Sequence, residues 1–139
     1  MKTDKLWKIF SLYIRLRDCI KFSERYCNGE YTPYAKCCSC GAVKHYKNGD
    51  AGHFINRTHL ILKYDERNVN FQCKQCNAFK QGNYADYREF MIIEYGIADV
   101  LELELMKKRP YKMDNYTKDH LIEMYSAKVK NYKKTLGIS

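Results

Sequence analysis

The sequence lacks any apolar run long enough to cross a membrane. A spanning helix needs about 20 consecutive apolar residues, and the most apolar segments here are interrupted by Lys, Arg or Glu. The first four residues lead into an amphipathic segment that has neither the apolar core nor the small-residue cleavage site of a secretion signal. These absences exclude a membrane-spanning protein and predict a soluble protein of the cytoplasm.

Internal repeats and low-complexity segments are also absent, and a composition with 45% hydrophobic and 14% aromatic residues excludes a disordered chain. A length of 139 residues fits a single domain, 1–139. We expect it to have three parts: an N-terminal helix (5–26), a compact centre that holds most Cys, His, Asn and Gly residues (37–83), and a helical C-terminal region (84–136).

Apolar residues at helical spacing predict the helices. The first covers 4–26 and ends before Asn28-Gly29. Three more are expected at 84–95 with Gly96 as its C-cap, at 97–108 before Pro110, and at 117–136 with Thr117 as its N-cap.

The chain carries a formal net charge of +9, from 25 basic and 16 acidic residues. The excess lies in the two flanks, because residues 51–100 contain six basic and six acidic side chains. Such a surplus suits a polyanionic partner such as a nucleic acid. The function of the centre must therefore be explained by something other than charge.

Seven cysteines, an odd number without a secretion signal, favour metal binding over disulfides. Cys37 and Cys40 form one C-x-x-C pair, and Cys73 and Cys76 form a second. Two such pairs predict a closed, structural Cys₄ zinc site. Two unrelated pairs or a redox motif are the alternatives. Cys38 is interpreted as a bystander, and Cys19 and Cys27 as small buried residues.

Between and after the cysteine pairs the chain reads Asp50-Ala51-Gly52-His53-Phe54, then Asn68, then Asn77. This order resembles the zinc-bearing HNH nucleases, in which a His ends the first strand, an Asn precedes the second Cys pair and a His or Asn follows the last Cys. Taken singly, Asn68 is more often a turn residue and Asn77 a helix cap.

Hydrolysis of a phosphodiester gives each residue a role. Neutral His53 would activate water as general base, and the Asn68 amide would fix its ring by a hydrogen bond. Asp50 and Asn77 are the nearest hard-oxygen ligands for a catalytic Mg²⁺ or Mn²⁺ ion. Asp65 and Glu66 remain alternatives to Asp50, because the HNH motif usually has an acid directly before the His, where this chain has Gly52.

More specifically, the chain resembles the NinG (Rap) family of phage recombination endonucleases over roughly residues 5–136. The likeness rests on segments 37–41, 50–54, 62–68, 72–77, 80–83 and Tyr87-Arg88. It implies an α+β, mostly helical fold in which a small zinc-stapled ββα-metal (HNH) core is framed by N- and C-terminal helices. It also implies an endonuclease that cuts branched DNA, such as Holliday junctions and displacement loops, in the cytoplasm of the bacterial host cell.

Selectivity for branch geometry predicts contacts to phosphates rather than bases. The candidates surround the centre: Lys44, Lys47, Arg57, Lys63, Lys74 and Lys80. Junction cutting calls for two symmetric sites and hence a homodimer, with 4–26 and 117–136 as the surfaces long enough to form it. A generic HNH nicking or restriction-type nuclease, and a zinc-knuckle module that binds nucleic acid without catalysis, are the rival interpretations.

Overall fold

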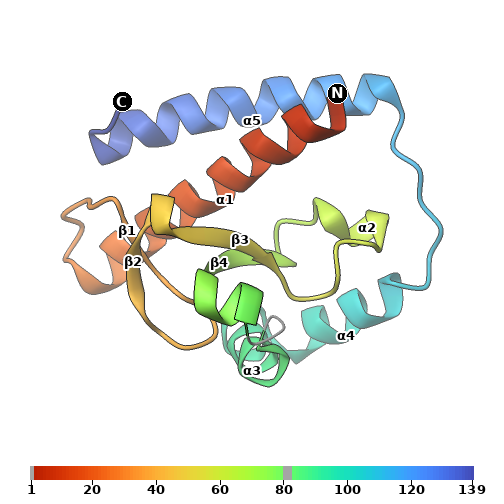
Figure 1. The fold of residues 1–139 in the computed structure, drawn as a ribbon, viewed down its shortest axis with the longest axis horizontal. Coiled ribbons are helices and arrows are strands. Elements are labelled where there is room, and N and C mark those ends of the chain that lie inside the picture. Colours follow the sequence, from red (N-terminus) through yellow and green to blue (C-terminus); the bar gives the residue numbers. More distant parts are fainter. Residues whose placement is uncertain (1, 80–82) are drawn as a thin grey trace.

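The computed structural model describes residues 2–79 and 83–139 as a mostly helical α+β fold with two small two-stranded sheets (Figure 1). The elements, in chain order, are α1 (Lys2–Tyr26), β1 (Tyr34–Lys36), β2 (Val43–His45), the 3₁₀ turn η1 (Tyr46–Asn48), β3 (Gly49–His53), α2 (Leu60–Lys63), β4 (Val69–Cys73), the π-helical turn η2 (Gln75–Phe79), α3 (Tyr84–Tyr95), α4 (Ile97–Met106) and α5 (Asn115–Leu136). Within these described residues no helix is long and apolar enough to cross a membrane.

The first and last helices, α1 and α5, lie side by side (Figure 1). Their apolar faces form one core with β1, β3 and β4, in which Phe10 and Ile14 are fully buried and Val129 is nearly so. Glu66, in the turn before β4, accepts hydrogen bonds from Tyr13 of α1 at 2.7 Å and Tyr125 of α5 at 3.0 Å. The two surfaces that the sequence suggested for a dimer are thus largely used within the chain.

The ribbon of β3 and β4 is the framework of the centre. The strands are antiparallel, with Gly49 opposite Cys73 and His53 opposite Val69. A side chain at Gly49 would collide with the Phe71 ring, so glycine permits the close approach of the strands. The turn η2 follows β4 directly, which sets a short helical turn against the end of the ribbon.

The free edge of β4 is covered by two side chains of α1 instead of a third strand. Asp18 accepts the Phe71 backbone N–H at 2.7 Å, and Arg17 donates to the Val69 carbonyl at 2.9 Å. Arg17 also pairs with Asp18 at 2.9 Å and is 8% exposed. This Arg17–Asp18 clasp satisfies backbone groups that an edge strand would otherwise leave unpaired.

Helices α3 and α4 build a second core on the other side of the ribbon, around Tyr87, Met91, Val100 and Leu103. The buried Tyr87 hydroxyl donates to the Gly52 carbonyl at 2.7 Å and accepts from the Asn70 amide at 3.2 Å. Both strands of the ribbon are therefore fixed to α3 by polar contacts.

The four predicted helices are present, with three boundaries corrected: α1 starts at Lys2 and not at residue 4, α4 ends before residue 108, and α5 starts before Thr117. Helix α3 and its Gly96 C-cap are as expected, and α4 ends at Met106. The last helix starts at Asn115, because the Asp114 side chain, rather than Thr117, caps it by accepting the Thr117 N–H at 2.7 Å. The expected irregular centre (37–83) contains β2, β3 and β4 and the short helical turns, whereas β1 lies before it.

Candidate metal centre and active-site cleft

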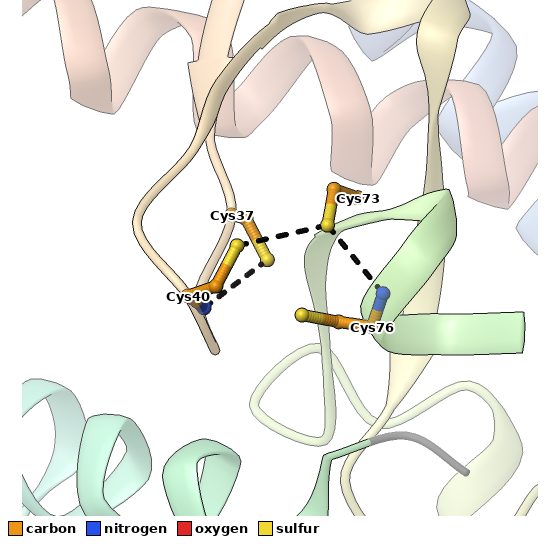
Figure 2. Close-up of side chains that lie close together, drawn as sticks. All are labelled: Cys37, Cys40, Cys73 and Cys76. Atoms are coloured by element: carbon orange, nitrogen blue, oxygen red, sulfur yellow. Dashed lines mark hydrogen bonds between the residues drawn. The ribbon is translucent and has the colours of Figure 1, made fainter. Parts of the chain in front are cut away.

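Four cysteine thiols converge at one point. Cys37 and Cys40 lie in the loop after β1, while Cys73 ends β4 and Cys76 lies in η2, and their sulfurs face one another (Figure 2). All four Sγ atoms lie within 4.8 Å of one another, and the Cys40 and Cys73 sulfurs are 3.7 Å apart. Thiolates placed tetrahedrally at 2.3 Å around zinc would be about 3.8 Å apart. The cluster can therefore hold a metal ion and is consistent with structural zinc.

Backbone geometry builds the two knuckles. The Cys40 N–H points to the Cys37 sulfur and the Cys76 N–H to the Cys73 sulfur, both at 3.5 Å. Gly41 has φ +81°, a left-handed conformation that favours glycine, at the turn after the first pair.

The remaining cysteines lie outside this cluster. Cys19 is fully buried in the first core, as expected, and Cys27 is half-buried near the end of α1. Cys38 packs at the edge of the second core, where burial raises the pKa of its thiol.

An open cleft of about 510 Å³ lies between α1 and the β3 strand. Asp50, His53 and Asn77, three of the predicted site residues, line it together with Arg57. The structure thus brings together the expected base and both expected metal ligands, from β3 and from η2.

The His53 ring is held on two sides. Its Nε2 lies 3.0 Å from the Lys63 carbonyl oxygen, and its face stacks on the Trp7 indole with centroids 5.1 Å apart. Because a carbonyl only accepts hydrogen bonds, Nε2 carries the proton and Nδ1 has the free lone pair. Burial lowers the pKa of His53 to about 4, so the ring is neutral at neutral pH.

Among the described residues the Asn68 amide makes no hydrogen bond to His53, so the expected direct hydrogen bond is wrong. The fully buried amide instead accepts from Ile55 N–H at 2.8 Å and donates to the carbonyls of Ile55 at 2.9 Å and Leu62 at 3.1 Å. It thereby fixes the segment between β3 and β4. This segment contains the short helix α2, whose last residue, Lys63, contacts the imidazole through its carbonyl oxygen.

The Asp50 carboxylate is shared between two donors. Lys74 Nζ lies 3.0 Å from Oδ1, and the Asn77 amide donates to Oδ2 at 3.1 Å. A 180° rotation of that amide would turn the Asn77 oxygen toward the carboxylate, giving two hard oxygen ligands side by side. Carboxylate and amide oxygens are ligand types that Mg²⁺ and Mn²⁺ take in proteins.

Packing explains why glycine stands directly before His53. A side chain at Gly52 would collide with the Gln72 side chain on the neighbouring strand.

The two alternatives to Asp50 are engaged elsewhere: Asp65 pairs with Arg67 at 3.0 Å, and Glu66 accepts hydrogen bonds from two tyrosine hydroxyls, one on α1 and one on α5. Neither lines the cleft, which leaves Asp50 as the acid beside His53.

The predicted phosphate contacts are in different situations. Arg57 is exposed and lines the cleft, and Lys44 and Lys47 are exposed on and just after β2. Lys63 is half-buried, and burial lowers the pKa of its ammonium group. Lys74 is exposed but pairs with Asp50, while Lys80 lies outside the described residues.

Sequence reasoning missed two parts of the cleft. Trp7 reads as one more apolar residue of an amphipathic helix, although it stacks on His53. The Lys63 carbonyl is a backbone group, which no side-chain motif can reveal. The one sequence feature that sets Trp7 apart from the other apolar residues of this helix is that it is the single tryptophan of the chain.

Comparison with known proteins agrees with the resemblance seen in the sequence. The chain is similar to the "Protein ninG" of Salmonella phage P22, with 43% identity over 74 residues that cover 52% of this chain and 36% of the relative. It is 41% identical over 69 residues to the "Protein ninG" of Escherichia phage 933W, covering 49% of this chain and 34% of the relative. It is 39% identical over 69 residues to the "Protein ninG" of Escherichia phage lambda, covering 49% of this chain and 33% of the relative. The matched segments thus span about a third of the length of these relatives. No solved structure matches. The family described as "Bacteriophage Lambda NinG protein" matches residues 3–135, and the chain belongs to this family.

Proposed function

We propose that the protein is a metal-dependent endonuclease of the HNH (ββα-metal) type that cuts branched DNA recombination intermediates. In this proposal His53 is the general base, Asn68 positions the loop behind it, and Asp50 with Asn77 holds Mg²⁺ or Mn²⁺. The Cys₄ cluster holds structural zinc. A phage protein with this activity would act in the cytoplasm of the host cell.

One observation carries the proposal: a neutral, oriented imidazole shares an open cleft with a carboxylate and an amide. The free Nδ1 of His53 can take a proton from water, because the Lys63 carbonyl fixes the tautomer and burial keeps the ring uncharged. The antiparallel strands β3 and β4 followed by η2 supply the two strands and short helical turn of a ββα unit.

Each of these residues has a part in the proposed hydrolysis of a phosphodiester bond. His53 removes a proton from water as its oxygen bonds to phosphorus, and the bond from phosphorus to the leaving oxygen breaks. Arg57, at the mouth of the cleft, is placed to contact a phosphate. When bound at Asp50 and Asn77, a divalent ion would offset the negative charge that develops on the phosphate and leaving oxygen.

The test incubates the protein with a four-way DNA junction and with a linear duplex of the same sequence, in Mg²⁺, in Mn²⁺ and in a chelator. We expect metal-dependent cleavage that prefers the junction. His53→Ala should slow it by about 100-fold or more, the usual contribution of a general base. Equal cutting of both DNAs would favour a generic HNH nuclease. Absence of cutting with either metal would contradict the nuclease and favour a module that binds nucleic acid without catalysis.

A matched control separates loss of the base from general damage. His120 is exposed on α5 and does not line the cleft. His120→Ala should therefore cut at the rate of the unmodified protein. If His53→Ala also kept the full rate, His53 would not be the base.

A further inference from the structure

A second hollow of about 360 Å³ adjoins the cleft, and His53 and Asn56 line both. The cleft lies toward α1, whereas the second hollow reaches toward α3 and α4, where Tyr84 and Lys107 line it. If a phosphate of a bound DNA strand lies at His53, this hollow therefore lies directly beside the phosphodiester bond that is cut.

The wall of the hollow carries an exposed, immobilised aromatic ring. Tyr84, at the start of α3, is 49% exposed, although its ring stacks on the buried Phe54 with centroids 5.1 Å apart and planes 9° apart. Its hydroxyl donates to Glu104 at 3.2 Å. A ring that is supported by Phe54 and anchored at its hydroxyl loses little further freedom when a flat ligand stacks on it.

The charges distinguish this hollow from the cleft. The Glu104 carboxylate lines it in an ion pair with Arg88 at 3.1 Å, so this pair offers a phosphate no net positive charge. Lys107 and His59 lie at the same hollow, where they offer polar contacts at its margin. A flat, largely uncharged ring with polar edges fits this combination better than a second phosphate does.

We propose that the Tyr84 hollow binds an unpaired nucleobase next to the phosphate that is cut, an inference that rests on the proposed function. A paired and stacked base has both faces covered within the duplex, so only a base that has left its stack can lie on Tyr84. The site therefore selects DNA with an unpaired base beside the cleavage position, as at a bulge or branch.

The experiment measures stacking without cleavage. A duplex with a single bulged 2-aminopurine, and a duplex with the same base paired, are titrated with the full chain in a chelator of Mg²⁺ and Mn²⁺ that is too weak to remove zinc. We expect the unmodified protein and Tyr84→Phe to quench the bulged base. Tyr84→Ala should abolish the quenching and weaken binding of the bulged duplex about 5-fold or more, with binding of the paired duplex unchanged.

Two further variants make the result interpretable. Tyr84→Leu keeps apolar bulk against Phe54 but has no flat ring, so it should behave as Tyr84→Ala does even if the alanine variant folds poorly. Tyr116→Ala removes a tyrosine that is 83% exposed on α5 and should behave as the unmodified protein does. Quenching that survives in Tyr84→Leu, or an equal loss of affinity for both duplexes, would overturn the proposal.

The readout also separates this inference from the proposed function. A protein that quenches the bulged base through Tyr84 but cuts no DNA would contradict the nuclease and keep the base site. A protein that cuts junctions while Tyr84→Leu quenches normally would keep the nuclease and contradict the base site.

Discussion

At the scale of single residues, the state of His53 depends on groups far from it in sequence. Trp7 covers one face of the ring and the Lys63 carbonyl fixes Nε2. Burial lowers the pKa of this ring, and the hydrogen bond to the Lys63 carbonyl opposes that shift. A histidine whose pKa is about 4 when folded and about 6.5 when unfolded contributes stability that is complete above pH 6.5 and is lost as the pH falls to about 4.

Removing the indole should therefore return His53 toward its ordinary titration. In Trp7→Ala we expect the pKa of His53 to rise by at least about one unit, because the ring gains water that stabilises its charged form. Proton NMR of the histidine ring, in the zinc-loaded protein without Mg²⁺ or Mn²⁺, measures this pKa directly. The pH at which the cleavage rate of the variant begins to fall should rise by the same amount relative to that of the unmodified protein.

Trp7→Phe is the matched control, since it keeps an aromatic face against the imidazole. Its His53 should titrate close to the original value. An unchanged titration in Trp7→Ala would mean that the indole is only part of the core and has no influence on the base.

At the scale of elements, the covered edge of β4 makes a prediction about stability. Asp18→Ala removes the acceptor of the Phe71 N–H and leaves the buried Arg17 without its carboxylate. Breaking such a pair costs about 3 kcal/mol of unfolding free energy. Urea unfolding measures it. Asp99→Ala, which removes a half-exposed carboxylate 3.8 Å from Arg67, should cost less than about 1 kcal/mol.

A similar loss in both variants would mean that the Arg17–Asp18 clasp has no special part in holding α1 on the sheet.

The metal cluster makes a second prediction at this scale. Cys73→Ser removes a ligand at the junction of β4 and η2, so bound zinc should fall from one per chain to near zero and the melting temperature should drop sharply. Zinc binding in small domains contributes on the order of 10 kcal/mol to folding. Metal analysis measures the bound zinc, and thermal unfolding measures the melting temperature. Cys27→Ser, outside the cluster, should retain one zinc ion; equal zinc contents would exclude the Cys₄ site.

What the sequence could predict at this scale follows from what is local. The two C-x-x-C pairs indicated the cluster because each knuckle is formed by a few consecutive residues. Helices α3 and α4 were evident from apolar spacing and Gly96. The contacts of Arg17 and Trp7 could not be predicted, because they join α1 to segments about 50 residues away and leave no periodic pattern. Asn68 was identified, but its partners are backbone groups, so its contacts were assigned wrongly.

At the scale of the whole molecule, Glu66 joins three parts of the chain: the turn before β4, α1 through Tyr13 and α5 through Tyr125. In Glu66→Gln one of the two acceptor oxygens becomes a donor, so one tyrosine hydroxyl loses its partner. We expect a loss of about 1–2 kcal/mol in unfolding free energy. Glu123→Gln, on the exposed face of α5, is the control for urea unfolding and should change little. Equal stabilities would show that the three parts are held by apolar packing alone.

The pairing of α1 with α5 has a consequence for the order in which the protein is made. Residues 37–79 carry the four clustered cysteines, the proposed base and the proposed metal ligands, and a ribosome completes them before α5. Helix α1 packs against β1, β3 and β4 as well as against α5. The strands can therefore receive α1, and Trp7 with it, before α5 is made, whereas the side of α1 that faces α5 is covered only afterwards. Helix α5 thus completes the core around α1 after the metal cluster and the cleft residues have been made.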